Sequence, residues 1–338
     1  MPDHKVRLSA NGNLSRRAML VAGLVAAQVA LVPFPPARAD YPDRVIRLVV
    51  PFAAGGPTDV VARLVSAKLG AKLGQSVIVE NRPGAGANIG ITAVAKAAPD
   101  GYTFLLTSNV FTGNPAVYTR RFYDPVADFV PMIDFGGSPN VIAAHPGTGF
   151  KTFDDLVAYA KANPGKLNYA IPGVGSLSQL GQELANLKAG IKLVAVPFNG
   201  GNPAVMAAVQ GTTQLVVANV ASAISLLREG QLVPLAQTGH KRWPDLPNVK
   251  TLDEYGIHGA NYGTYYSMLA PAGTPQPIVD RVAKEVLAIL EEPEVRERLF
   301  KAGIDVKEGG GPDRLRAHIA QELPMWMDVA KQTGIRID

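Results

Sequence analysis

The 338-residue chain contains no cysteine and only five histidines. The absence of cysteine excludes disulfide bonds, thiolate metal sites and a cysteine nucleophile. The histidines lack the H-E-x-x-H spacing, or any other close spacing, that a zinc site requires. We therefore expect no metal and no cofactor, and we interpret each histidine as a surface or boundary residue.

Outside the N-terminal segment, the chain also lacks a large excess of positive or negative charge. The formal charge is +5, but residues 1–39 carry +4 of it and the remainder is close to neutral. The pI of about 9.3 is thus mainly a property of that segment, and it gives little reason to expect nucleic acid as a partner. Long apolar runs are missing too: Met19–Val32 is shorter than the ~20 residues that span a bilayer.

The N-terminal segment has the parts of a signal peptide. Arg16 and Arg17 precede the mildly apolar run, and an A-x-A cleavage site ends at Ala39. Paired arginines are typical of a twin-arginine signal, but Met19 stands where such signals usually have Phe, so the general secretory route stays open. We predict that residues 1–39 are a cleaved signal peptide and that the mature protein is periplasmic.

The mature chain alternates short apolar strands with amphipathic helices. With 47% hydrophobic residues it has an ordinary globular composition. Repeated βα units predict an α/β fold with parallel strands, and the length allows two lobes, each a mainly parallel sheet flanked by helices, with a cleft between them. We place lobe 1 at residues 40–140 plus 262–338 and lobe 2 at 141–261. The expected strands are 45–50, 77–80, 102–106, 140–144, 167–170, 193–197, 214–219, 232–238 and 265–270, and the expected helices are 59–73, 88–98, 152–163, 177–188, 203–210, 221–229, 278–290, 293–302 and 311–333.

Two stretches share the order strand, glycine loop, helix start. In Leu48–Arg63 a strand ends at Pro51, and Thr58 or Asp59 opens a helix; Ile171–Ser178 has the same order. A helix start leaves backbone N–H groups unpaired, which suits an anion, although ordinary βα turns share the pattern. We interpret the stretches as two walls of a carboxylate site. Asp59 should shape its loop, because a carboxylate beside the N–H groups would repel an anion.

Two further loops have features of binding sites. Thr107, Ser108 and Asn109 follow a predicted strand, at the edge where open α/β sheets bind ligands. Gly84–Gly90 resembles a dinucleotide-binding fingerprint but has one residue too many and lacks the downstream acidic residue. We interpret Gly84–Gly90 as a turn followed by a helix start and expect no NAD.

Ser176 is the nearest approach to a serine nucleophile. It follows Gly173-Val174-Gly175 and is expected to begin a helix, and no G-x-S-x-G elbow occurs. We predict that it caps the helix or donates to a ligand oxygen. A periplasmic hydrolase that uses Ser176 is an alternative that would need a base within hydrogen-bond reach.

Five short sequence motifs lie along the mature chain. They are residues 46–56 (IRLVVPFAAGG), 79–86 (VENRPGAG), 98–103 (APDGYT), 159–169 (YAKANPGKLNY) and 269–275 (LAPAGTP). Together they resemble Bug-type proteins, the extracytoplasmic substrate-binding components of tripartite tricarboxylate transporters. The resemblance covers essentially all of residues 41–338.

This resemblance implies a type II-like periplasmic-binding fold whose two lobes close like a Venus flytrap over a small carboxylate. It implies no enzyme activity, and it gives membrane transporter subunits as partners. Loop N–H groups and bridging waters would hold the ligand. The ligand-binding residues carried over are Phe52, Ala53, Ala54, Gly55, Thr58, Asp59, Thr107, Ser108 and Asn109 in lobe 1, and Ser176, Ser178, Phe198, Asn199, Gly200 and Asn219 in lobe 2.

The chain departs from the family pattern on one wall of the site. Gln179 stands where the family often has histidine, Phe198-Asn199 where Tyr-Lys is common, and Ala218 where an acidic residue is common. These departures change the charge and hydrogen bonding, so we expect a small organic carboxylate or a related amide without naming it. We expect a monomer. A sensor that presents the ligand to a signalling receptor is an alternative with the same cleft.

Overall fold

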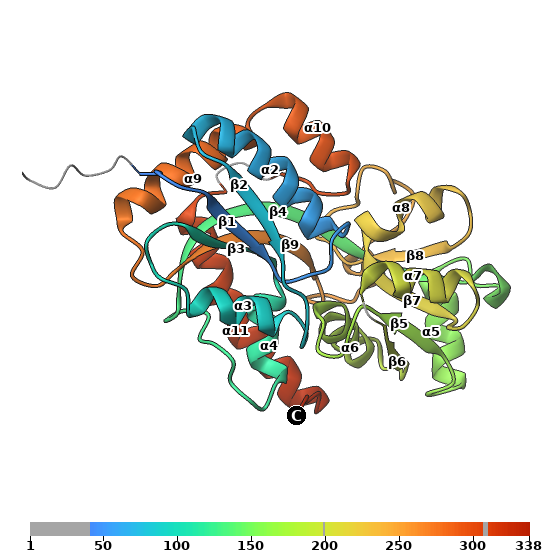
Figure 1. Ribbon diagram of the computed structural model, residues 1–338. Helices are drawn as coiled ribbons and strands as arrows, with labels where there is room; N and C mark the ends of the chain where they lie inside the picture. Colours follow the sequence, from blue (N-terminus) through green and yellow to red (C-terminus); the bar gives the residue numbers. More distant parts are fainter. Residues whose placement is uncertain (1–40, 199, 307–309) are drawn as a thin grey trace, which may run out of the picture. The chain divides into compact units, whose positions relative to one another are not determined.

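The long strand β4 (Phe129–Ala144) joins all strands of the computed structural model into one connected sheet. The structure describes residues 41–198, 200–306 and 310–338, so the predicted signal peptide and Asn199 lie outside the described residues. Within this part the strand order is β2-β1-β3-β9-β4-β7-β5-β6, and β8 also pairs with β4. Figure 1 shows β4 passing between the two groups of strands.

The remaining strands and the helices alternate along the chain, as the sequence predicts. The strands are β1 (Ile46–Val50), β2 (Val77–Asn81), β3 (Thr103–Ser108), β5 (Asn168–Ile171), β6 (Val194–Pro197), β7 (Leu215–Asn219), β8 (Val233–Gln237) and β9 (Gly263–Pro271). The helices are α2 (Pro57–Leu73), α3 (Asn88–Ala95), α4 (Val110–Val117), α5 (Phe153–Ala162), α6 (Leu177–Ala189), α7 (Gly201–Val209), α8 (Val220–Arg228), α9 (Gln276–Leu290), α10 (Pro293–Lys301) and α11 (Pro312–Thr333).

The strands form two sets with the same construction. In the first set, β1 pairs in parallel with β2 and β3, and β9 runs antiparallel between β3 and residues 129–139 of β4. In the second set, β5 pairs in parallel with β6 and β7, and residues 140–144 of β4 run antiparallel to β7 and β8. The predicted parallel strands are confirmed in both sets, and every antiparallel pair of these strands includes β4 or β9.

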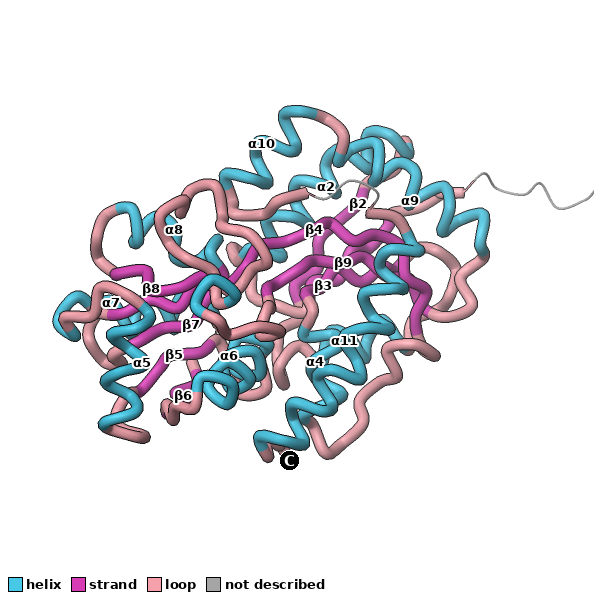
Figure 2. Tube along the Cα trace, turned by 180° about the vertical axis from the view of Figure 1, so that it is seen from behind, coloured by secondary structure: helices cyan, strands magenta, loops and turns pink. Residues whose placement is uncertain are grey.

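The alternation of side chains along β4 builds two cores in the second set. Val141 and Ala143 face the core under α7 and α8, whereas Ile142 and Ala144 face the core under α5 and α6, as the two-residue period of a strand requires. Figure 2 shows helices on both sides of these strands.

The C-terminal helix reaches across both strand sets. Leu315 and Ile319 of α11 pack in the core of the first set, while Trp326 and Val329 pack in the core under α5 and α6. Residues 42–338 accordingly form one compact unit by their contacts. The predicted lobe boundaries stay a prediction.

Local signals account for the helix ends that the sequence predicted well. Thr152 accepts a hydrogen bond from the N–H of Asp155, and the Asp155 carboxylate accepts one from the N–H of Thr152, which completes a capping box before α5. Pro57 occupies the first position of α2, two residues before the predicted start, and Gly74 ends that helix with φ 70°.

One helix was missed, one strand was predicted only in part, and several boundaries differ by one to three residues. Helix α4 was not predicted, because Gly113 and Pro115 give it a poor helical sequence. Only residues 140–144 of β4 were predicted; the earlier part carries prolines, glycines and register shifts near Pro131 and Asp134 that hide its strand character. Strand β3 continues to Ser108, two residues beyond the predicted end.

No helix in the described ranges combines the length and the apolar character that a membrane crossing requires.

Candidate functional site

The carboxylate of Asp59 organises the loop between β1 and α2. Asp59 is 2% exposed, and its oxygens accept hydrogen bonds from Gly55 N (2.9 Å), Asn81 Nδ2 (2.9 Å) and Arg63 Nε (2.8 Å). Burial alone would raise the pKa of Asp59, but the hydrogen bonds from Arg63, Gly55 and Asn81 hold it below its ordinary value. Asp59 therefore shapes the loop as predicted, and the N–H of Gly55 is already occupied.

Asn81 is a site-building residue that the sequence reasoning missed. It ends β2, and its Nδ2 donates to the carbonyl of Phe52 (3.1 Å) as well as to Asp59. This side chain ties the end of β2 to the loop after β1. The available signal was an asparagine directly after an apolar strand, which was interpreted only as part of a turn.

The first turn of α2 leaves N–H groups available to a ligand. Gly56 caps the helix without a side-chain hydrogen bond. Among the described residues, no hydrogen bond uses the N–H of Thr58 or Asp59. Unpaired N–H groups at a helix start, together with the helix dipole, favour an anion.

Thr107, Ser108 and Asn109 are tied to the crossing strand β9. Thr107 and Ser108 pair with residues of β9, and Asn109 donates from Nδ2 to the carbonyl of Gly263 over 2.7 Å. All three residues are buried, and the hydroxyl of Thr107 donates to the carbonyl of Ser108. Among the described residues, neither the Ser108 hydroxyl nor Asn109 Oδ1 has a hydrogen-bond partner, so both are free polar groups.

In the second strand set, Ser176 caps α6. Its Oγ accepts from Gln179 N (3.3 Å), and Gln179 Oε1 accepts from Gly175 N (2.7 Å). The predicted capping role is confirmed, whereas the N–H of Gly175 is occupied by a side chain of its own helix. In the part of the chain that the structure describes, no titratable side chain forms a hydrogen bond with Ser176, so no base is positioned to activate it.

The loop between β6 and α7 has fewer free N–H groups than the pattern indicated. Phe198 N donates to the carbonyl of Ile171 (2.9 Å), and Gly200 N donates to that of Pro172 (3.2 Å). These bonds join the loop to the one after β5. Phe198 and Gly200 thus shape the wall with their backbones, and the Asn199 prediction falls outside the described residues.

Ser178 and Asn219 are connected through strand β4. Asn140 Nδ2 donates to Ser178 Oγ (2.9 Å), and Ser138 Oγ donates to Asn219 Oδ1 (2.8 Å). Asn219 Oδ1 also accepts from Ala221 N (2.8 Å) and so caps α8. Ser138 and Asn140 were missed, because polar residues at the beginning of a predicted strand were interpreted as a boundary.

The loops of the two strand sets meet beside the site. A Cβ added at Gly113 of α4 would lie 3.0 Å from Leu177 Cδ2, and one at Gly175 would lie 2.5 Å from Val117 Cγ2. Helix α4, which starts after Asn109, therefore packs directly on the loop that carries Ser176. The structure thus brings the helix that follows Asn109 together with the β5–α6 loop; that the two strand sets form opposite walls of one site stays a prediction.

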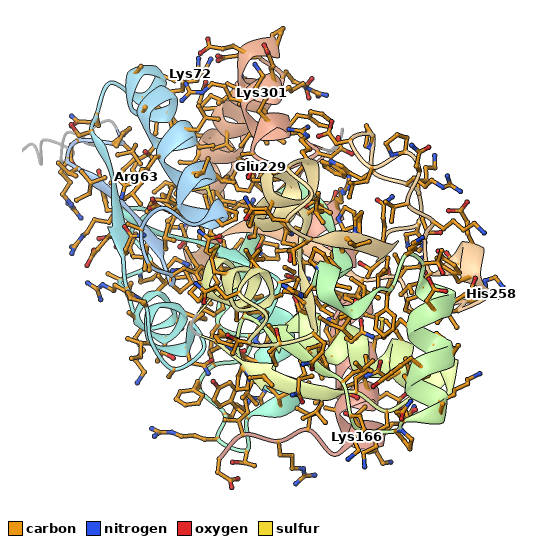
Figure 3. The ribbon with its side chains drawn as sticks, turned by 90° about the vertical axis from the view of Figure 1, so that its right-hand side faces the viewer. Arg63, Lys72, Lys166, Glu229, His258 and Lys301 are labelled. Atoms are coloured by element: carbon orange, nitrogen blue, oxygen red, sulfur yellow. The ribbon has the colours of Figure 1, made fainter. Side chains whose placement is uncertain are left out.

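The residues of the candidate site include no lysine or arginine. Their one charged member is Asp59, which is paired with the more exposed Arg63. The basic residues labelled in Figure 3, namely Arg63, Lys72, Lys166 and Lys301, lie at the periphery of the molecule in that view. An anion at this site would therefore depend on N–H groups and helix N-termini. Among the described residues, no group of three or more histidine, aspartate or glutamate side chains is placed to hold a metal.

Comparison with known proteins decides the family. Residues 61–335 match the model of the tripartite tricarboxylate transporter family receptor. The chain belongs to this family. Protein BugT of Bordetella pertussis is 32% identical over 324 residues, which cover 95% of this chain and 98% of that protein.

Solved structures of family members are similar to this chain in sequence and fold. Rpa4515 of R. palustris, solved with adipate, is 35% identical with a TM-score of 0.82, over 88% of this chain and 99% of that one. MatC of Rhodopseudomonas palustris, solved with bound malate, is 34% identical with a TM-score of 0.78, over 86% and 99%. The resemblance to Bug-type proteins and the two-lobe α/β fold are thereby confirmed. The family consists of substrate-binding proteins and not of enzymes.

Proposed function

We propose that this protein is a periplasmic solute-binding protein that captures a small carboxylate between its two lobes and delivers it to a tripartite tricarboxylate-type membrane transporter. Two relatives of similar fold were solved with adipate and with malate. The observation that carries the proposal is the contact of helix α4 with the start of helix α6 at Gly113 and Leu177. A ligand beside that contact can touch both strand sets, and only a ligand that does so can favour a closed state.

Backbone groups on both sides would hold the carboxylate. The first turn of α2 supplies the N–H groups of Thr58 and Asp59, and the Ser108 hydroxyl lies at the end of the neighbouring strand β3. On the opposite side, α6 and α8 begin at Ser176 and Asn219. Bridging waters would complete the contacts where no side chain reaches the ligand.

Residues 1–39 serve as the cleaved signal peptide in this proposal, and the mature protein begins at Asp40. Closure would bend β4 near residues 138–140, where its pairing changes from β9 to β7. The mature protein would act as a monomer.

Calorimetry tests the proposal directly. The mature protein is titrated with a panel of mono-, di- and tricarboxylates, and at least one of them should bind. The combined variant Ser176→Ala and Asn109→Ala should lower the affinity for that compound while the protein still unfolds cooperatively. A panel that produces no heat with the wild type would show that the ligand class is wrong.

A further inference from the structure

Two asparagines in the second strand set each leave one buried amide atom without a partner. Asn140 is 1% exposed, and its Oδ1 accepts no hydrogen bond; Asn219 Nδ2 is buried and donates none within the described part of the chain. Buried polar atoms are nearly always paired in native proteins. An unpaired acceptor and an unpaired donor at a ligand site indicate that a ligand completes them.

The backbone places these two side chains next to each other. Asn140 and Asn219 are opposite residues of the antiparallel pair β4 and β7. Asn140 N donates to Thr238 Oγ1 (2.9 Å), and its carbonyl accepts from Thr238 N (3.0 Å), so both groups point away from β7. Such a pair is not hydrogen-bonded, and its Cα atoms are only about 4.5 Å apart with the side chains on one face.

The remaining atoms of both amides are occupied. Asn219 Oδ1 accepts from Ala221 N and from Ser138 Oγ, which leaves its Nδ2 as the free donor. Asn140 Nδ2 donates to Ser178 Oγ, which leaves Oδ1 as the free acceptor. The pair thus presents one donor and one acceptor side by side.

We propose that Asn140 and Asn219 form a subsite for a terminal carboxamide of the ligand. The N–H of the carboxamide donates to Asn140 Oδ1, and its carbonyl accepts from Asn219 Nδ2. A carboxylate has only acceptors and would face the Asn140 oxygen unfavourably. The inference rests on the proposed function and narrows its ligand class to monoamides of small dicarboxylic acids, whose carboxylate end meets the N–H groups of α2.

Dicarboxylates and the monoamides of the same carbon-chain length test this preference. The mature wild-type protein is titrated calorimetrically with succinate, succinic acid monoamide, adipate and adipic acid monoamide. At least one monoamide should bind tenfold or more tightly than its matching dicarboxylate. Equal or tighter binding of the dicarboxylates would overturn the subsite; it would mean that Asn140 turns its NH₂ group to the ligand while Ser178 donates to Oδ1.

A substitution isolates the donor. Asn219→Asp keeps the oxygen that caps α8 but replaces the Nδ2 donor with a charged acceptor, so the variant should still unfold cooperatively while affinity for the monoamide falls at least tenfold. Asn248→Asp, at an exposed loop position, adds the same charge and should leave the affinity unchanged. An Asn219→Asp variant with wild-type affinity would contradict the subsite.

A second substitution addresses the acceptor. Ser178→Ala removes the partner that orients the Asn140 amide, so the ratio of monoamide to dicarboxylate affinity should fall towards one. An unchanged ratio would overturn the assignment of Asn140. If none of the four probes binds to the wild type, the subsite and the proposed dicarboxylate-like ligand class both fail, whereas binding without any effect of the variants rejects the subsite alone.

Discussion

The Oε1 atom of Gln179 accepts a hydrogen bond from the backbone N–H of Gly175, with an N–O distance of 2.7 Å. The relationship repeats in the first strand set, where the carboxylate of Asp59 accepts the N–H of Gly55. In both loops a side chain in the first turn of the helix turns back to the last glycines before it. The two walls of the site therefore share a backbone design but differ in charge.

This relationship predicts the effect of Gln179→Glu. The new carboxylate can still accept the Gly175 N–H, and an acidic residue suits the first turn of a helix, so the stability should not fall. The added negative charge beside the site should lower carboxylate affinity at least tenfold, which is about 1.4 kcal/mol. Titration calorimetry measures this, with Gln231→Glu at an exposed position as the control. Unchanged affinity would place Gln179 away from the ligand.

Gly175 should be intolerant of any side chain. Its φ is +73°, and an added Cβ would lie 2.5 Å from Val117 Cγ2 and 2.9 Å from Ile337 Cδ1. Gly149 has a similar φ of +76° with nothing within 4 Å, so Gly149→Ala isolates the backbone cost of about 1 kcal/mol. Gly175→Ala should cost about 1–3 kcal/mol more, because it overpacks the contact between α4 and the β5–α6 loop.

Urea unfolding of the two glycine variants checks this difference. Equal losses of unfolding free energy in Gly175→Ala and Gly149→Ala would show that the packing of Val117 on the loop contributes nothing. The carboxylate affinity of Gly175→Ala should fall as well, since the loop that carries Ser176 must move.

The buried carboxyl group of Glu322 in α11 should make the stability of the protein depend on pH. Its Oε2 accepts from Thr112 Oγ1 (2.6 Å) and Tyr265 OH (3.0 Å), and burial raises its pKa above the ordinary value of 4.5. A carboxyl group with a raised pKa contributes stability that is complete below the ordinary value and is lost as the pH rises through the raised one.

Glu322→Gln should therefore gain stability relative to the wild type as the pH increases. The difference between the two unfolding free energies, measured in urea at about pH 5 and at about pH 8, should shift towards the variant at the higher pH. A difference that does not vary with pH would contradict the raised pKa.

Much of the fold was predictable because its signals are local. The capping residues of α5, the proline at the start of α2 and the apolar strands all lie within a few residues of what they determine. Helix α4 and the first part of β4 were not predictable for the opposite reason. Glycine and proline oppose their formation locally, and the packing of α11 and the pairing with β9 stabilise them.

The sequence predicted which loops contribute to the candidate site, but not the contacts that their side chains make. Strand ends and helix starts identified the loops that contain Asp59 and Ser176, and simple electrostatics gave Asp59 its structural role. The occupied N–H of Gly175 and the link from Asn140 to Ser178 depend on side-chain directions and on a strand 38 residues away. Such contacts have no local signature.

Mass spectrometry of the ligand released from natively purified protein tests the central claim most directly. The protein is purified without denaturation and extracted into organic solvent, and the extract is compared with that of the Asn109→Ala and Ser176→Ala variant. The account predicts a small compound with at least one carboxylate that is released by the wild type and depleted from the variant. A released compound without a carboxylate, or one retained equally by the variant, would contradict it.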